Sequence, residues 1–344
     1  MDFSGSGLGL NFNRRRFIGG ALGVGAIAAL PGCKGLSSSS EALTVGGLAV
    51  TCNLTLPVAC AANAAANGGT AQFAYQKFTG WPEIKEALMS GDLQAAYMLA
   101  PLVMDLADKK VPVKIVSIGH RSGAVIMVRT DSTYRTFRSL TGKRVAIPSR
   151  FAVDYLFLRK MLALEGMTPD DVEVVEMAPA DMPAALYVNG VDAYCTGEPF
   201  GAAAQSAGYA RPLSMTRDEW PRYMCCVLTV REELMQSNPA LVQDLVNHVL
   251  GAGVWLDQRA ANRETAIQLA AGREYFNQDA AILRFVMKEP PDRVTYGDLR
   301  MVPREFDELM QLSVEAGTLT HPVPYATYVD DSFAEAAKPA PILL

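Results

Sequence analysis

The sequence predicts an α/β fold of two lobes, each a mainly parallel sheet flanked by helices, with a two-strand hinge and a helical C-terminal region. From residue 43, short apolar segments typical of buried strands alternate with helical segments, which is typical of parallel sheets covered by helices. This alternation occurs in two sets, and residues 124–130 and 224–230 connect them. Beyond the second connection the chain is helical, and we expect it to pack on the first lobe.

The first set begins at residue 43 with an apolar segment that fits a buried strand. An alanine-rich helix follows and ends at Gly68 and Gly69, whereas the next helix has Pro82 near its start and Gly91 after its end. The expected strands of this set are 43–50, 71–78, 94–99, 113–118 and 124–129. The expected helices are 54–67, 81–89 and 100–110.

The second set repeats the alternation, and the chain then returns to the first lobe. The expected strands are 144–148, 172–177, 191–195 and 225–230. The expected helices are 153–165, 183–189 and 199–207, followed by 241–258, 263–271, 279–286 and 304–316. We therefore assign residues 43–129 and 226–330 to a discontinuous first lobe, residues 130–225 to the second lobe, and residues 331–344 to a C-terminal tail.

Residues 1–33 have the pattern of an export signal, because a basic patch precedes a short apolar run and a small-residue cleavage site. Arg14 and Arg15 before an apolar segment resemble a twin-arginine signal. Leu-Pro-Gly-Cys, ending at Cys33, resembles the lipoprotein box, in which the cysteine becomes the acylated first residue. A plain signal anchor, or a chance cysteine after an ordinary cleavage site, is the alternative. Residues 34–42 then form a flexible spacer, and the protein is exported and lipid-anchored on the periplasmic or cell-surface side of the membrane.

Composition limits the classes of function. The chain of 344 residues is 50% hydrophobic and 19% charged, as in globular proteins. A net charge of −5 and an arginine cluster confined to the signal give no basic surface for nucleic acid. We find no nucleophile motif, no phosphate loop and no zinc-ligand spacing, so we expect no catalysis, no cofactor and no metal. The cysteines after Cys33 are expected to be buried thiols.

Candidate ligand contacts follow the strands, because ligands of open α/β sheets bind beyond the carboxyl ends of strands. They are Thr51, Cys52, Asn53, Trp81, Ala100, Pro101, His120, Arg121, Ser122, Arg150, Phe151, Asp154 and Glu198.

Several of these residues have a second interpretation. Trp81 is a pocket wall or a core residue, and residues 120–122 form part of the site or only a solvated turn. Arg150 clamps an anion bidentately or pairs with a surface acid. Glu198 binds a ligand amine or caps the helix that follows it. Asp154 and Glu198 favour a ligand with donor groups, whereas Arg150 and His120 favour an anion, so a zwitterion or a heterocycle fits this mixture best.

Four stretches in order resemble the periplasmic binding proteins for nitrate, bicarbonate, taurine and alkanesulfonates, which feed ABC importers. They are residues 80–88 (Gly-Trp-Pro-Glu-Ile-Lys-Glu-Ala-Leu) with 91–96, residues 97–101, residues 140–146, and residues 196–200 (Thr-Gly-Glu-Pro-Phe). The resemblance implies a type II binding-protein fold and a monomer that binds a small molecule between its lobes. It also implies delivery of that molecule to an ABC permease with a cytoplasmic ATPase.

The chain departs from the resemblance at two places. Nitrate and bicarbonate binders show a histidine near the position of Asp154 and a basic residue near residues 223–225, and this chain has neither. These differences weaken nitrate and bicarbonate as ligands. A ligand sensor, or an enzyme resembling pyrimidine-precursor synthases on the same scaffold, is the alternative function.

Overall fold

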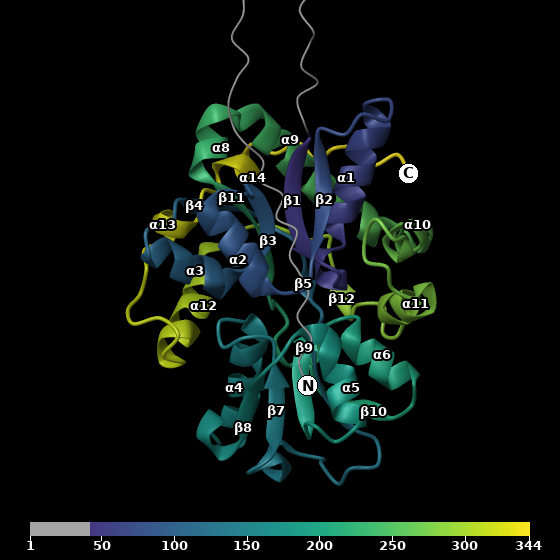
Figure 1. Cartoon of the computed structure of the whole chain (residues 1–344), viewed down its shortest axis with the longest axis vertical. Helices are drawn as coiled ribbons and strands as arrows, with labels where there is room; N and C mark the ends of the chain where they lie inside the picture. The colour runs from purple at the N-terminus through teal and green to yellow at the C-terminus, as the bar shows by residue number, and fades with distance from the viewer. Residues whose placement is uncertain (1–41) are drawn as a thin grey trace, which may run out of the picture. The chain divides into compact units, whose positions relative to one another are not determined.

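The computed structural model describes residues 42–344 (Figure 1). The expected signal peptide, the acylation site at Cys33 and nearly all of the spacer lie outside these residues. Two five-stranded sheets dominate the described chain, and a two-stranded ribbon joins them.

The first sheet has the strand order β2-β1-β3-β11-β4. Strand β1 (Leu43–Leu48) is parallel to β2 (Phe73–Phe78) and β3 (Ala95–Leu99). The returning strand β11 (Cys226–Arg231) runs antiparallel between β3 and β4 (Val113–Ile118). The carboxyl ends of the parallel strands and the beginning of β11 therefore lie at the same edge of this sheet.

Helices cover both faces of the first sheet (Figure 1). Helix α1 (Thr55–Ala66) packs against α9 (Pro239–Gln258), whereas α2 (Trp81–Ser90) packs on β3 and α3 (Ala100–Asp108) packs on β4. All five residues of β3 are buried, as expected for a strand covered on both faces.

The second sheet has the strand order β10-β6-β9-β7-β8. Its strands are β6 (Ala124–Arg129), β7 (Arg144–Ile147), β8 (Glu173–Glu176), β9 (Ala193–Gly197) and β10 (Ala210–Met215). Strands β7, β8 and β9 are parallel, and β6 is antiparallel to β9 and β10. The sequence predicts residues 124–129 in the first lobe, but their hydrogen bonds place β6 in the second sheet.

Strand β10 has no counterpart among the expected elements. It contains Pro212, which cannot donate a backbone hydrogen bond, and it pairs only with β6 at the edge of the sheet. Proline is confined to such edge positions and bulges. Pro212 therefore makes the segment look unlike a strand in the sequence, and it also explains why the strand lies at the edge of the sheet.

Helices also flank the second sheet. They are α4 (Val153–Leu164), α5 (Met182–Tyr187) and α6 (Phe200–Ser206). Helix α4 packs on β9 and β6, and α5 packs against α6. A separate small core, which includes Met127, Met182 and Tyr194, fills the space on one side of this sheet. The second sheet and its helices are thus a packed unit, here called the second lobe.

The C-terminal region contacts both lobes. Its helices are α10 (Ala260–Ala271), α11 (Ala280–Lys288), α12 (Pro303–Glu315), α13 (Tyr325–Tyr328) and α14 (Ser332–Glu335). Helix α10 packs on α9, but α11 packs on α6, and α12 packs on both α3 and α4. Strand β12 (Val294–Thr295) pairs with β5 (Arg121–Ser122) beside the crossing to the second lobe. The region therefore bridges the lobes rather than packing on the first lobe alone.

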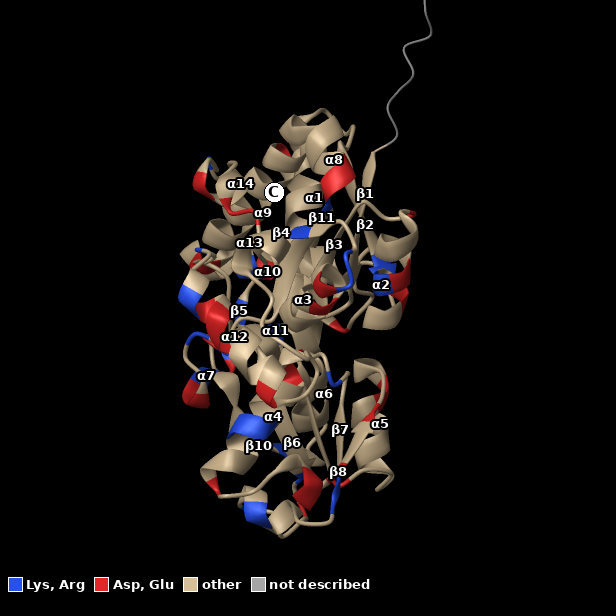
Figure 2. Ribbon diagram, turned by 90° about the vertical axis from the view of Figure 1, so that its left-hand side faces the viewer, with Lys and Arg blue, Asp and Glu red and all other residues tan. Residues whose placement is uncertain are grey.

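The remaining elements are short. They are α7 (Thr216–Glu219), α8 (Glu232–Ser237) and the 3-10 helices η1 (Thr51–Asn53), η2 (Phe137–Leu140), η3 (Pro169–Asp171) and η4 (Pro179–Asp181). Basic and acidic residues are interspersed over the outer helices (Figure 2). Among residues 42–344, no helix is both long enough and apolar enough to cross a membrane.

Candidate ligand-binding site

The strand ends of the two sheets meet around a small cavity of about 20 Å³. Eleven residues from both lobes line it: Val50, Cys52, Trp81, Leu99, Pro148, Asp154, Pro179, Thr196, Gly197, Cys225 and Cys226. This volume has room for about one water molecule, whereas pockets that hold small ligands measure roughly 300–1,000 Å³. The two walls of the cavity are therefore in nearly closed contact.

The first lobe contributes one wall from the edge where its parallel strands end. Val50 and Cys52 follow β1, Trp81 begins α2 just after β2, and Leu99 is the last residue of β3. The adjacent residues Cys225 and Cys226, at the beginning of β11, complete this wall. Trp81 thus lies at the edge of the sheet where the parallel strands end, and most of its surface is buried.

The second lobe contributes the opposite wall in the same way. Pro148 follows β7, Pro179 follows β8, and Thr196 and Gly197 end β9. Asp154 lies in the first turn of α4, which follows β7. Binding beyond the carboxyl ends of parallel strands is the general rule for such sheets, and here the rule applies to both sheets at once.

Backbone and glycine contacts bring the two walls together. The amide and the hydroxyl of Thr51 both donate to the carbonyl oxygen of Glu198, at 2.8 and 2.9 Å. A Cβ atom at Gly197 would lie 3.1 Å from the Cys52 sulfur. A larger residue at 197 would therefore crowd the Cys52 sulfur where the two walls meet.

Three of the eleven lining residues are cysteines, and a fourth cysteine, Cys195, contacts the backbone of the lining residue Asp154. Cys225 Sγ and Cys226 Sγ are 3.8 Å apart, and the Cys195 thiol lies 3.2 Å from the carbonyl oxygen of Asp154. Within the described chain, the five cysteines are buried free thiols, as the sequence predicted. Burial raises the pKa of the Cys52, Cys195 and Cys226 thiols well above the ordinary value. These three thiols are therefore neutral at physiological pH.

Two polar groups of the second wall lack a hydrogen-bond partner. Asp154 is 3% exposed and its Oδ1 is unpaired, and Thr196 is 1% exposed and its Oγ1 is unpaired. Burial raises the pKa of Asp154 to about 7. Buried polar groups are nearly always hydrogen-bonded, so each exception needs an explanation. The lining residues include no lysine, arginine or histidine.

Of the candidate residues, Cys52, Trp81 and Asp154 line this cavity. The candidate residues Asn53, Ala100 and Pro101 do not line the cavity and have structural roles instead. Asn53 Oδ1 accepts the amide of Leu48 at 2.8 Å and so fixes the end of β1. The Ala100 amide donates to the Cys225 carbonyl at 3.1 Å. Pro101 is buried in the first turn of α3.

The candidate residues 120–122 lie at the crossing between the lobes and do not line the cavity. Arg121 donates to the carbonyl oxygens of Asp298 and Arg300 at 2.6 and 2.9 Å, and it forms a 2.9 Å ion pair with Glu305. Ser122 has a φ of 58° and pairs with β12. Burial lowers the pKa of His120 to about 3, so its ring is neutral. This segment ties the crossing to the C-terminal region.

Arg150 and Phe151 lie outside the cavity. Arg150 is exposed, its Nε is 3.5 Å from the Glu176 carboxylate, and its guanidinium group is 5.6 Å from the centre of the Tyr155 ring. The geometry matches the surface-pairing interpretation of Arg150. Phe151 is half-buried, and its ring centre is 5.8 Å from the Lys109 ammonium group of the first lobe.

Glu198 is buried behind the cavity wall rather than in it. Its Oε1 accepts from Arg293 Nη1 at 2.9 Å, and its Oε2 accepts the amide of Ala202 at 2.8 Å. Arg293 also donates to Gln205 Oε1 at 2.7 Å. The carboxylate therefore caps the beginning of α6 and pairs with a C-terminal arginine that sequence reasoning did not connect to it.

Sequence reasoning also missed Thr196, Gly197, Cys225 and Cys226 as lining residues. The signal for the first two was available, because they end a strand in the same stretch that contains Glu198. The two cysteines instead had the apolar surroundings of a core strand.

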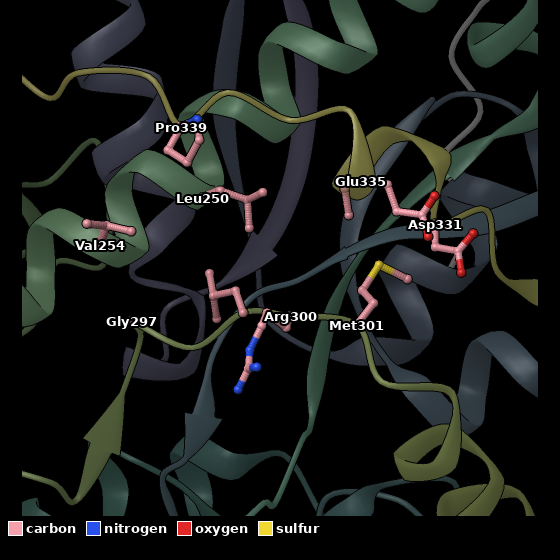
Figure 3. A pocket seen from close by; sticks show the side chains of 10 residues that line it. Leu250, Val254, Gly297, Arg300, Met301, Asp331, Glu335 and Pro339 are labelled. Carbon is pink, nitrogen blue, oxygen red and sulfur yellow. The ribbon is translucent and has the colours of Figure 1, made fainter.

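A second hollow, of about 400 Å³, lies on the first lobe and the C-terminal region (Figure 3). Leu250 and Val254 of α9, residues 297–301, and Asp331, Glu335 and Pro339 surround it. No strand end of either five-stranded sheet contributes, so it lacks the feature that makes the smaller cavity the candidate site. Within residues 42–344, no three His, Cys, Asp or Glu side chains come together in a metal-binding arrangement.

Comparisons with known proteins agree with this architecture. Over 248 residues the chain is 27% identical to the nitrate/nitrite binding protein NrtA of Nostoc sp., covering 65% of this chain and 55% of that protein. The chain thus spans about half the length of that relative. It is 25% identical over 209 residues to the taurine-binding periplasmic protein of Escherichia coli, covering 58% and 65% of the two chains.

Solved structures share the fold over most of the chain. The ligand-binding component of an ABC-type import system from Staphylococcus aureus, solved with zinc bound, matches with a TM-score of 0.78 and 26% identity. The match covers 87% of this chain and all of that one. NrtA from Synechocystis matches with a TM-score of 0.74 at 20% identity over 83% of each chain.

An enzyme also shares the fold. The desulfurization enzyme DSZB matches with a TM-score of 0.63 at 18% identity, over 86% of this chain and 98% of that one. This likeness concerns the fold alone, and the two-lobed scaffold therefore does not by itself decide between binding and catalysis.

The family model with the description "NMT1-like family" matches residues 37–271. The chain belongs to the NMT1-like family.

Proposed function

We propose that this protein is the extracytoplasmic solute-binding component of an ABC importer. The observation that supports this most is the cavity between the lobes, lined from the strand ends of both sheets. A ligand in this position contacts both lobes and stabilises their closed arrangement. The relatives named as nitrate/nitrite- and taurine-binding proteins support the same role.

The closed arrangement is part of the proposed mechanism. Because the cavity holds about 20 Å³, a small organic molecule enters only when the lobes separate. Closure then brings the loop of Thr51 and Cys52 back toward the loop of Gly197 and Glu198 and holds the ligand between them. The protein would present this closed form to the permease, whose cytoplasmic ATPase drives import.

We further propose that the protein is exported and anchored through acylated Cys33, since residues 14–33 combine a twin-arginine pattern with a lipoprotein box. Mass spectrometry of the membrane fraction tests this proposal. The expected mature chain begins at acylated Cys33, and a soluble, full-length chain would refute it.

We favour binding over catalysis because the cavity lining offers no lysine, arginine or histidine that would activate a nucleophile. Its Cys52 and Cys226 thiols are neutral, and Asp154 has neither a basic partner nor a histidine beside it. A bound compound that is converted at a rate abolished by Cys52→Ser or Asp154→Asn would favour the enzyme alternative.

Ligand retention tests the binding role and requires no choice of candidate ligand. The purified mature protein is incubated with a cell extract of small molecules, separated by size exclusion and analysed by mass spectrometry. Gly197→Val places a side chain against Cys52 and should abolish retention, whereas Ala65→Val adds the same side chain on the exposed face of α1 and should not. Failure of the parent protein to retain any compound would refute the binding role. Equal retention by Gly197→Val would place the site elsewhere.

A further inference from the structure

The unpaired groups of the cavity indicate what kind of ligand it accepts. Asp154 Oδ1 and Thr196 Oγ1 are buried, line the cavity and have no hydrogen-bond partner. A carboxylate oxygen accepts hydrogen bonds, and a hydroxyl group accepts or donates them. A bound molecule with N–H donors would satisfy both groups, and it would remove the cost of leaving them buried and unpaired.

No cationic side chain is available for an anionic ligand among the residues that line the cavity. The neighbouring arginines are held elsewhere: Arg293 by Glu198 and Gln205, Arg121 by Glu305, and Arg150 at the surface beside Glu176. The His120 ring does not line the cavity. An oxyanion would therefore enter a buried site without a counter-charge, which is costly in a region of low dielectric constant.

The helix termini do not replace the missing cations. The amino-terminal end of α4 faces the cavity edge, and such ends attract anions through their free amide groups. However, Asp154 occupies the first turn of α4 and brings an acid to the place where an anion would bind. Where Asp154 is ionised, above pH 7, the acid and an anionic ligand would repel each other.

We propose that this cavity binds a small molecule with an amidinium, guanidinium, ammonium or amide group, and that it discriminates against oxyanions such as nitrate and sulfonates. This inference rests on the binding role proposed above and names the ligand class of the same site. Asp154 Oδ1 accepts from the donor group, and Thr196 Oγ1 accepts a second N–H. The Trp81 ring and the thiols contact the remaining, mostly apolar part of the ligand, and a cation near the indole gains a cation–π attraction.

Ion pairs of matched shape test this ligand class. Guanidinium and nitrate are both small, planar ions with three-fold symmetry. Acetamidinium and acetate likewise have nearly the same shape. Each pair therefore differs mainly in charge and in hydrogen-bond donor groups. Ethanesulfonate extends the anion series. Binding is measured by isothermal titration calorimetry and by the shift in melting temperature at equal ionic strength.

The proposal expects acetamidinium and guanidinium to bind and to raise the melting temperature, and expects the three anions to do neither. Asp154→Asn should weaken binding of the cations ten-fold or more. Asp105→Asn alters another buried acid, which pairs with Lys109 on α3 away from the cavity, and should leave the affinity unchanged.

Three results would overturn the proposal. Binding of nitrate or ethanesulfonate in preference to the cations would reverse the ligand class and would leave the solute-binding role intact. Binding of none of these ions up to millimolar concentration would exclude the class of small N–H donors, while the retention experiment still decides the binding role. Equal losses in Asp154→Asn and Asp105→Asn would show a general effect on folding, and Asp154 would not be the ligand acceptor.

Discussion

Asp154→Asn should stabilise the ligand-free protein most above pH 7 and should have little stabilising effect below pH 4. Burial raises the pKa of this carboxyl group from its ordinary value of 3.8 to about 7. Between these two values the unfolded chain releases the proton while the folded chain keeps it. The free energy of unfolding therefore falls as the pH rises through this window, and the loss is complete above pH 7.

The magnitude follows from the width of the window. A shift of about three pKa units corresponds to about 4 kcal/mol at 1.36 kcal/mol per unit. An asparagine has no charge to bury, so the variant should avoid this loss. With an entropy of unfolding of about 2.1 cal/mol/K per residue over roughly 300 residues, the variant should melt about 6 °C above the parent at pH 8.

Other titrating groups near Asp154 do not create the same window. The groups that interact with it electrostatically are the thiols of Cys52, Cys195 and Cys226 and the phenol of Tyr223, and all have pKa values raised well above their ordinary values. They stay neutral from pH 4 to pH 8. The difference between variant and parent therefore isolates the carboxyl group.

Urea denaturation of parent, Asp154→Asn and Asp105→Asn at several pH values between 4 and 8 measures the effect. The control variant loses its ion pair with Lys109 and should show no gain in stability that grows toward pH 7. A difference between Asp154→Asn and parent that is the same at pH 4.5 and pH 8 would refute the reasoning. So would a variant that is less stable than the parent at pH 8.

Three further predictions concern other parts of the site. Trp81→Ala should weaken ligand binding about ten-fold or more by removing an aromatic wall of the cavity, whereas Trp255→Phe, in α9, should not; calorimetric titration compares them. Glu198→Ala should lower the free energy of unfolding by about 3–5 kcal/mol, because Arg293 stays buried without its partner; urea denaturation measures this, and a loss below 1 kcal/mol would contradict it. Cys60 and Cys195 are buried outside the cavity lining and should react with a thiol reagent only at the rate of unfolding, whereas Cys52, Cys225 and Cys226 should also react when the lobes separate; fast labelling of Cys60 in the native protein would contradict this.

Local patterns predicted most of the fold, because strands and helices are marked by periodicity, glycine and proline. The expected strand 113–118 agrees with β4, and the expected helix 153–165 is one residue longer than α4. The sequence was less informative about which sheet a crossing strand joins. Residues 124–129 were expected as a strand, but only their pairing with β9 and β10 assigns them to the second lobe.

The site was harder to predict because burial between lobes resembles burial in a core. The rule of strand ends led to Cys52, Trp81 and Asp154, which line the cavity. Cys225 and Cys226 have apolar neighbours in the sequence, and nothing local distinguishes a cavity wall from a packed interior. Local patterns also do not predict contacts between residues that are far apart in the chain, such as the pair of Glu198 and Arg293.

Glu198 shows how a residue can shape the cavity without lining it. Its carbonyl oxygen accepts two hydrogen bonds from Thr51 of the opposite lobe, while its carboxylate is held by Arg293 and by the beginning of α6. The side chain thus fixes the loop whose backbone joins the lobes and whose neighbour Gly197 contacts Cys52. In Glu198→Ala the carbonyl oxygen remains, so lobe contact is still available. We therefore expect a larger effect on folding stability than on ligand affinity, the opposite of what we expect for Trp81→Ala.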